Sequence, residues 1–400
     1  MTKDTGLQIN PKIKRLVCSS SGQEVETGGF RRPIGLCSCC PPPGKPVVVE
    51  YVLDQVELGE PAREKGIWSF SELLPVVGPE PSFASDVGLT AIVELEPWSR
   101  EAGITVLAKN EGTNPSGSFK DRGLAVGVAF GTACGAQRFC LPTQGNAGVA
   151  ASLFSARLGL PGCLVYMPEG YEDGLYHREA RYFGAEVRFH GSNIAAAGRK
   201  MREDAAAELA SGAYVDMSTF FEPGRLEGKK TMGLEIFQQC GADGLPDWIL
   251  YPTGGGTGLV GIWKAFEELI GLGKIDPARH RLPRMVAVQG ENCAPVVKSF
   301  EAGLDEVRPV ESAGTIADGL DVPGAIMGHG ILHTIRESKG TAVVVSEDEI
   351  LERFSECGRI GVAASFESAA VVAALHRLLA SGGVTRGERV LLLLTAGHLI

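Results

Sequence analysis

The chain has 400 residues, of which 53 are glycine and 44% are hydrophobic, which is enough to build two packed domains with many tight turns. Its formal net charge of −10 offers no basic surface for nucleic acid, so we expect no nucleic-acid partner. No apolar run approaches the ~20 residues of a membrane helix, and the N-terminus lacks the apolar core of a signal peptide. These features predict a cytoplasmic enzyme or binding protein with no membrane partner.

Four of the ten cysteines lie in the first forty residues and have the outline of a zinc ribbon. Cys18 and Ser21 form one half of the pattern, and Cys37 and Cys40 form the other, so a serine stands where one ligand is required. A serine hydroxyl is a poor zinc ligand, and adjacent residues rarely point at one metal, which argues against Cys39 as the substitute. A bound structural zinc and a metal-free remnant are both open, and we predict the remnant, with no metal.

The stretch NEGTNPSGSFKDRG, residues 110–123, combines a loop with the start of a helix. Pro115 and Gly117 favour a turn, so a helix can start only after them. Lys120 therefore falls in the first helical turn, where the helix dipole disfavours a protonated ammonium by about 0.3 to 1 kcal/mol. A neutral amine condenses with aldehydes, so Lys120 is a candidate for covalent catalysis. The alternative is an ordinary solvated lysine.

From residue 104 onward, short apolar runs alternate with helical patterns. This alternation predicts the α/β fold class, with parallel sheets covered by helices on both faces. Ligands bind such sheets at the carboxyl ends of the strands. The first series contains strands at 104–108, 138–141, 163–167, 186–189 and 214–217, and helices at 119–134, 147–158, 175–183 and 194–210.

The second strand of this series runs into TQGNAG, residues 143–148. Its glycines allow close backbone approach, and the helix start that follows offers free N–H groups to a carboxylate. Asn146 adds an amide that can bind a phenolate oxygen or ring substituent. The alternative is that Asn146 only caps the helix.

A second alternating series begins with a strand at 247–251 and passes through PTGGGTG, residues 252–258, into an amphipathic helix at 259–269. Bare backbone amides and the helix dipole make this loop a cradle for one phosphate. Residues 256–261 also satisfy G-x-G-x-x-G, and the rival interpretation is a nicotinamide-dependent oxidoreductase. Against it, the acidic Glu291 lies about 30 residues on instead of ~20. A phosphate cradle together with an aldehyde-reactive lysine indicates pyridoxal phosphate.

These motifs resemble those of threonine synthases, in the fold type II group of pyridoxal-phosphate enzymes, over nearly the whole chain. NPSGSFKDRG is similar to the cofactor-lysine motif, with Lys120 as the lysine that forms the Schiff base. EPGRLEGKKTMGLE, residues 222–235, resembles the stretch whose arginine, here Arg225, binds the substrate phosphate; the alternative is a surface arginine paired with a glutamate. Thr395 matches the hydroxyl residue that faces the pyridine nitrogen. The resemblance implies cofactor contacts from Phe119, Lys120, Asn146, Gly254, Gly255, Gly256, Thr257, Gly258 and Thr395, and substrate contacts from Thr143, Gln144, Gly145, Ala147 and Arg225.

The resemblance also implies the architecture of the tryptophan synthase β-like enzymes, with the cofactor in a cleft between two domains. The large domain would comprise 58–120 and 226–400, and the small domain 121–225, after an N-terminal ribbon-like segment at 1–57. The family further implies a homodimer that acts on a small amino-acid substrate.

The departures from the family cluster where the substrate would lie: Gln144, Thr219, Phe220 and the final residues 395–400, TAGHLI. Three functions therefore stay open. The first is threonine synthase, which converts O-phosphohomoserine and water to threonine and phosphate. The second is another elimination or β-replacement on a hydroxy- or phospho-amino acid, by a dehydratase or a specialised-metabolite synthase. The third is a protein that holds the cofactor without turnover.

Overall fold

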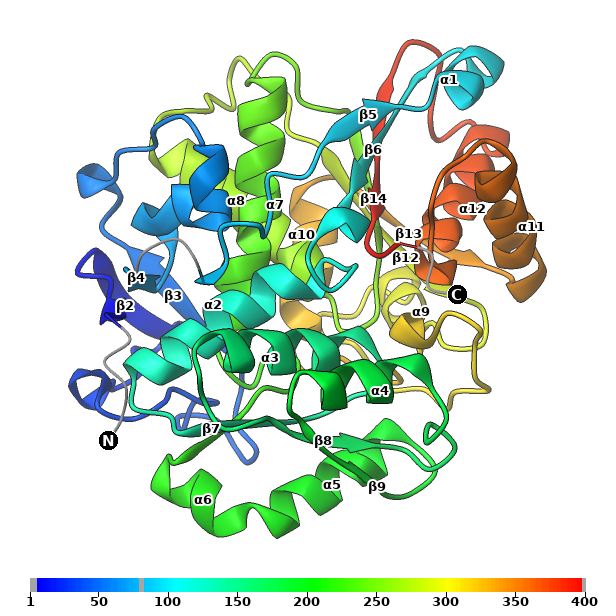
Figure 1. Cartoon of the computed structure of the whole chain (residues 1–400). Coiled ribbons are helices and arrows are strands. Elements are labelled where there is room, and N and C mark those ends of the chain that lie inside the picture. Colours follow the sequence, from blue (N-terminus) through cyan, green and yellow to red (C-terminus); the bar gives the residue numbers. More distant parts are fainter. Residues whose placement is uncertain (1–5, 79–82, 398–400) are drawn as a thin grey trace. The chain divides into compact units, whose positions relative to one another are not determined.

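A computed structural model describes residues 6–78 and 83–397 of the chain (Figure 1). Parallel strands alternate with helices along most of the sequence, so the predicted α/β class is confirmed. Within these two described ranges, no helix combines the length and the apolar character needed to cross a membrane. His398, which belongs to the divergent end of the chain, lies outside the described residues.

The chain folds as two compact units. The first unit contains the chain up to residue 89 together with 120–231, and the second contains 90–119 and the chain from residue 232 onward. The N-terminal segment lies in the first unit by this division. The functional division into small and large domains stays a prediction.

The first unit is built on a four-stranded parallel sheet in the order β10-β7-β8-β9. Helices α3 and α5 pack against opposite faces of this sheet (Figure 1). The predicted helix at 194–210 is present as two helices that meet at Ala205, a buried residue with φ of −105°. The elements are α2 (Lys120–Ala133), β7 (Arg138–Pro142), α3 (Asn146–Arg157), β8 (Leu164–Met167), α4 (Leu175–Tyr182), β9 (Glu186–Phe189), α5 (Ile194–Asp204), α6 (Ala206–Ser211), β10 (Tyr214–Asp216) and the first part of α7 (Gly224–Cys240).

The N-terminal part of this unit contains two small antiparallel pairs, β2 with β3 and β1 with β4. The hydroxyl of Tyr51, at the end of β3, donates to Glu227 Oε2 of α7 at 3.0 Å, and the Lys230 ammonium lies 4.3 Å from the centre of the Tyr51 ring. These contacts are buried and anchor the β2–β3 pair to α7. The elements are β1 (Gln8–Ile9), β2 (Ile13–Cys18), β3 (Val47–Tyr51) and β4 (Val76–Val77), with 3-10 helices at Gly28–Phe30, Leu53–Gln55 and Arg63–Leu73.

The second unit is built on a six-stranded sheet in the order β13-β12-β11-β14-β6-β5, in which only the edge strand β5 is antiparallel to its neighbour. Helix α12 lies on one face of the sheet, and α8 and α10 lie on the other (Figure 1). The elements are β5 (Ile92–Glu94), α1 (Glu96–Ala102), β6 (Thr105–Asn110), β11 (Trp248–Pro252), α8 (Thr257–Gly271), β12 (Arg284–Gly290), α9 (Pro295–Glu301), α10 (Gly328–Glu337), β13 (Thr341–Val345), α11 (Glu347–Arg359), α12 (Phe366–Ala380) and β14 (Arg389–Leu394), with 3-10 helices at Glu111–Thr113 and Asp318–Leu320.

Apolar runs and specific polar pairs explain why these segments form. Every residue of β11 is buried, as expected for a central strand of a parallel sheet that is covered on both faces. Helix α11 starts with a capping box, in which Ser346 and Glu349 satisfy each other's backbone N–H groups. In β6, the buried Lys109 ammonium donates to Glu235 at 2.9 Å and to the Thr90 carbonyl at 3.0 Å, so its charge is compensated.

Candidate functional site

Three motif-bearing segments of the second unit follow three neighbouring strands. The lysine loop, residues 111–119, follows β6 and leads to Lys120. Thr395 follows β14, and the glycine loop, residues 253–258, follows β11. Strand β14 lies between β11 and β6 and runs parallel to both. The carboxyl ends of parallel strands meet at one edge of a sheet, so the sheet brings these three segments to one edge.

The end of β14 is hydrogen-bonded along the lysine loop. The Phe119 N–H donates to the Thr395 carbonyl at 2.8 Å, and the Gly397 N–H donates to the Gly117 carbonyl at 3.0 Å. Between these two bonds the intervening residues form an antiparallel bridge. The backbone immediately before Lys120 is therefore hydrogen-bonded to the segment that contains Thr395, the predicted partner of the pyridine nitrogen.

The glycine loop leaves no room for side chains. A Cβ at Gly254 would lie 2.2 Å from the Gly319 carbonyl oxygen, and a Cβ at Gly258 would lie 2.1 Å from the Tyr251 hydroxyl oxygen. Gly256 has φ of 79°, in the left-handed region that L side chains disfavour. Helix α8 begins directly after it, so the free N–H groups of its first turn lie at this edge. The loop fits a phosphate cradle, and Gly255, the central glycine, is only half-buried.

Gln289, which the sequence did not indicate, holds the start of the glycine loop through a hydrogen bond. Its side-chain amide donates to the Thr253 carbonyl at 3.0 Å, while its oxygen accepts the N–H groups of Val296 at 2.8 Å and Val297 at 3.2 Å. Gln289 is fully buried near the end of β12, next to β11. A glutamine inside the otherwise apolar run MVAVQG is the signal that could have identified it.

Lys120 is the first residue of α2 and is half-buried, so its predicted place in the first helical turn is confirmed. The ring of the preceding Phe119 is 8% exposed and packs edge-on against the Tyr251 ring, with the centroids 6.1 Å apart. The hydroxyl of Tyr251 has its pKa raised well above the ordinary value by burial. Tyr251 is thus a neutral side chain that positions Phe119 and the glycine loop.

Helix α2 packs against α7 through a seam of four glycines, namely Gly123 and Gly127 on α2 and Gly224 and Gly228 on α7. A Cβ at Gly228 would lie 2.0 Å from the Arg122 carbonyl oxygen, and a Cβ at Gly224 would lie 2.7 Å from the Gly127 Cα. Residues four apart share one face of a helix, so each pair forms a flat strip on its helix. The two backbones touch directly, one turn after the lysine.

The asparagine loop connects β7 to α3 in the first unit. The Thr143 hydroxyl accepts the Gly145 N–H at 3.0 Å and closes the turn. Asn146 is the first residue of α3, followed by Ala147. The Asn146 side-chain oxygen is buried and has no hydrogen-bond partner among the described residues. The buried oxygen is an acceptor that lacks a donor. The predicted contact with a phenolate oxygen would instead be donated by the NH2 group of the Asn146 amide.

Arg225 lies at the same edge of the first unit as the asparagine loop, because β10 and β7 are parallel neighbours. It is the second residue of α7, and its guanidinium donates to the Met217 carbonyl just after β10. The side chain is 3% exposed, burial lowers its pKa, and its Nε has no partner among the described residues. The alternative interpretation as a surface arginine is therefore wrong. The guanidinium keeps one buried donor for an anion.

Glu222 is a second buried charged group that the sequence did not indicate. Its carboxylate accepts the backbone N–H of Gly224 at 2.6 Å and that of Arg225 at 2.8 Å, and so caps α7. Burial raises the pKa of this carboxyl to about 7, although the nearby Arg225 guanidinium lowers it in part. The N-terminus of α7 is therefore capped by a carboxyl whose pKa is raised to near neutral pH.

Two of the positions that depart from the family, Phe220 and Gln144, differ in their environments. Phe220 is 2% exposed and has φ of 65°, which strains a bulky side chain. Gln144, in the asparagine loop, donates to the Tyr171 hydroxyl at 3.2 Å. The amino-acid sequence around Phe220 does not predict this backbone conformation. Both departures lie at the edge where the first unit carries Asn146 and Arg225.

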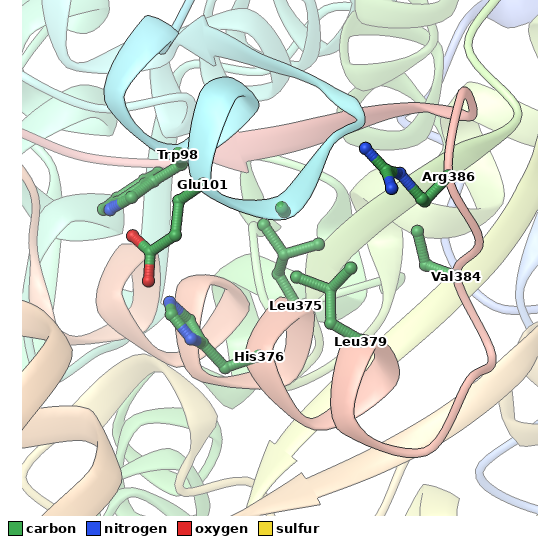
Figure 2. Close-up of a pocket in the computed structure, with 8 residues that line it drawn as sticks. Trp98, Glu101, Leu375, His376, Leu379, Val384 and Arg386 are labelled. Atoms are coloured by element: carbon green, nitrogen blue, oxygen red, sulfur yellow. The ribbon is translucent and has the colours of Figure 1, made fainter.

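A pocket of about 350 Å³ lies in the second unit. Figure 2 shows side chains that line it, among which the Glu101 carboxylate points toward the His376 ring. The pocket lies beside the start of β6 and the start of β14, which is the edge opposite to the three motif-bearing segments. It is therefore distinct from the candidate site. Its lining residues are Trp98, Glu101, Ala102, Leu375, His376, Leu379, Val384 and Arg386.

Each unit thus carries candidate groups of its own. The second unit contains the glycine loop, which is the candidate phosphate cradle, and the hydroxyl residue Thr395, which is 4% exposed. The first unit contains the amine of Lys120, the amide of Asn146 and the Arg225 guanidinium. The Asn146 oxygen and the Arg225 Nε are buried and have no partner among the described residues. Each of these groups, taken by itself, suits one part of pyridoxal phosphate, which presents an aldehyde, a ring oxygen, a ring nitrogen and a phosphate.

Residues 84–396 match the sequence profile of the family described as pyridoxal-phosphate dependent enzyme. Solved structures with the same fold include maize serine racemase, with a TM-score of 0.64 and 18% identity over 78% of this chain and 88% of that one. The processed form of threonine deaminase isoform 2 from Solanum lycopersicum has a TM-score of 0.65 and 18% identity over 78% of this chain and 80% of that one. The chain is a fold type II pyridoxal-phosphate-dependent enzyme.

The sequence relatives narrow this class. The chain is 32% identical to the threonine synthase of Methanosarcina acetivorans, over 88% of this chain and 85% of that protein. It is also 32% identical to the threonine synthase of Methanocaldococcus jannaschii, over 84% of this chain and 80% of that protein. It is 30% identical to the threonine synthase of Halalkalibacterium halodurans, over 82% and 88% respectively. The chain belongs to the threonine synthase family, as the sequence motifs predicted.

Proposed function

We propose that this protein converts O-phosphohomoserine and water to threonine and phosphate, as a cytoplasmic homodimer. The observation that carries the proposal is the hydrogen bonding of the lysine loop to the Thr395 segment, at the edge that holds the glycine loop. The names of the sequence relatives support this choice of reaction.

Lys120 is the proposed catalytic residue. Pyridoxal phosphate, when bound, supplies an aldehyde for the lysine amine and an electron sink for the substrate carbanion. Lys120 then acts as the general base that removes the α-proton of the substrate and as the acid that returns a proton. Its place in the first turn of α2 favours the neutral amine that this role needs.

Three further groups are proposed to hold the cofactor. The backbone N–H groups of residues 254–258, within the glycine loop, bind the phosphate at the start of α8. The Asn146 amide contacts the ring oxygen, and the Thr395 hydroxyl faces the ring nitrogen. A neutral hydroxyl stabilises a protonated ring nitrogen less than a carboxylate would, so Lys120 carries more of the proton transfer.

The substrate is proposed to bind at the edge of the first unit's sheet. The turn at 143–147 offers backbone N–H groups and the Thr143 hydroxyl to the substrate carboxylate, and Gln144 lies in the same turn. The Arg225 guanidinium binds the substrate phosphate before it leaves from the γ-carbon. Its buried and unpartnered Nε supports this role, because a buried donor without a partner is costly unless a ligand satisfies it.

A second candidate is another elimination or β-replacement on a hydroxy- or phospho-amino acid. Phe220 favours it, because an apolar ring stands where the family often has a polar residue for the phosphate. The structural relatives, which include a racemase and a deaminase, share the fold and thus are compatible with either reaction.

The two candidates are separated by a screen of phosphohomoserine, phosphoserine, serine and threonine with the purified holoenzyme. Release of phosphate and formation of threonine from phosphohomoserine, without keto acid, is the expected result. Keto acid formed fastest from serine or threonine would favour a dehydratase. Absence of turnover on all four substrates would favour a protein that only holds the cofactor.

A further inference from the structure

The N-terminal cysteines form a compact cluster. The Sγ atoms of Cys18, Cys37, Cys39 and Cys40 all lie within 4.8 Å of one another. The Cys18 sulfur is 3.6 Å from that of Cys40 and 3.5 Å from that of Cys37. A tetrahedral zinc ion with Zn–S bonds of about 2.3 Å places its ligand sulfurs about 3.8 Å apart, which matches these distances.

Two tight turns hold the four thiols in place. After β2, the Gly22 N–H donates to the Cys18 carbonyl at 2.9 Å, and Gly22 has φ of 67°. On the second turn, the Lys45 N–H donates to the Cys37 sulfur at 3.3 Å, and Gly44 has φ of 93°. A Cβ at Gly44 would lie 2.2 Å from the Cys37 carbonyl oxygen, so only glycine fits there. An N–H donor to sulfur is a contact that stabilises a thiolate ligand.

The argument that Cys39 and Cys40 point apart is wrong for this chain. The turn at 37–44 folds so closely on itself that both adjacent thiols reach the same point. The Ser21 hydroxyl lies 3.6 Å from the Cys39 sulfur, as a neighbour of the cluster. The pattern C-x-x-S with C-x-C-C therefore contains four thiols, although it lacks the usual second C-x-x-C pair.

We propose that these four cysteines bind one structural zinc ion, with Cys39 as the ligand that replaces the serine. Four thiolates are a closed, soft ligand set, which zinc prefers in structural sites. Binding releases up to four thiol protons and requires no oxidant. The ion ties the start of β3 to the end of β2, where the described part of the chain has no disulfide to do so. This inference is independent of the proposed reaction.

The test is the metal content of the purified holoenzyme, expressed without added metal and measured by mass spectrometry. We expect about one zinc per chain, released to a chelating dye when a mercurial reagent blocks the thiols. Cys39→Ser should reduce the bound zinc at least fivefold while the visible absorption of the cofactor persists, which shows that the remainder of the protein is folded.

Two matched variants serve as controls. Ser21→Ala removes the hydroxyl beside the cluster, and Cys240→Ser removes a half-buried thiol at the end of α7, so both should retain the zinc of the parent protein. A wild-type protein without zinc after expression in zinc-rich medium would overturn the proposal, as would a Cys39→Ser variant with unchanged zinc. Eight free thiols instead of ten in the denatured, unreduced protein would show a disulfide and would also overturn it.

Discussion

Substitution of Arg225 by alanine tests the phosphate-binding proposal directly. The guanidinium is 3% exposed, so any contact that it makes with a substrate phosphate is shielded from water. A hydrogen bond to a charged group contributes about 1.5 to 3 kcal/mol, and a guanidinium binds phosphate with more than one donor. We therefore expect Arg225→Ala to reduce kcat/KM for phosphohomoserine at least about a hundredfold, which is roughly 2.7 kcal/mol of transition-state binding.

The assay compares phosphorylated with unphosphorylated substrates. Phosphate release measures the reaction of phosphohomoserine, keto acid measures any reaction of serine or threonine, and visible absorption confirms that the cofactor is bound. Free serine and threonine have no phosphate, so kcat/KM for these substrates should fall much less than kcat/KM for phosphohomoserine. The variant also leaves Glu222 without the cation beside it, but the carboxyl, whose pKa is about 7, can take up a proton and avoid an isolated buried charge.

Arg202→Ala is the matched control. Arg202 donates to Asp216 at 2.7 Å and to the Ser218 hydroxyl at 3.0 Å, so this change removes another arginine from the same edge of the sheet. Its side chain already has two partners and should not be needed for phosphate. Equal losses on phosphorylated and unphosphorylated substrates in Arg225→Ala would refute the reasoning and would favour the second candidate function.

Four other predictions follow from the fold and the site. Lys120→Ala should abolish the visible absorption that borohydride removes from the parent protein; a spectrum unchanged by the substitution would exclude this lysine. Gly255→Asp should lower the affinity for pyridoxal phosphate, measured by titration of the apoprotein, because a carboxylate would repel the phosphate, and unchanged occupancy would make the loop purely structural. Gly228→Ala should destabilise the protein by about 3 kcal/mol in denaturant unfolding, because its Cβ overlaps the backbone of α2, whereas Gly358→Ala, which meets nothing within 4 Å, should not destabilise it. Because burial raises the pKa of Glu222 to about 7, the folded state keeps a proton between pH 4.5 and about 7 that the unfolded state releases. The free energy of unfolding should therefore decrease as pH rises through this range, by up to ~1.4 kcal/mol per pH unit, and Glu222→Gln should flatten this slope.

The sequence predicted the sheets well because strand and helix patterns alternate at the spacing of parallel β-α units. The strand at 186–189 has the predicted bounds, and Lys120 begins the helix that Pro115 and Gly117 delay. The break at Ala205 was not predictable, since alanine favours a helix and the chain there has neither proline nor glycine. Its side chain is 1% exposed and belongs to a buried cluster, so tertiary packing decides the geometry.

The candidate site was predictable wherever a motif joins a strand to a helix. The glycine loop and the asparagine loop both follow their strands as expected. Gln289 was missed although it interrupts an apolar run, because its partner Thr253 is distant in the sequence. Glu222 was missed because glutamate is not among the residues that commonly cap a helix N-terminus. Cys39 was misjudged for a related reason: the general rule for adjacent residues holds only for an ordinary backbone, and the turn at 37–44 is unusually tight.

The glycine seam between α2 and α7 has a consequence for attempts to alter this enzyme. Where side chains separate two helices, a change in their size can shift a helix by a fraction of an ångström and reshape the site. Here only hydrogen atoms separate the two helices at the four glycines, Gly123, Gly127, Gly224 and Gly228. No substitution at these positions can bring the helices closer, and any larger residue forces them apart. Laboratory evolution should therefore find its useful variation in surrounding loops, such as 143–147, and should leave these four positions untouched.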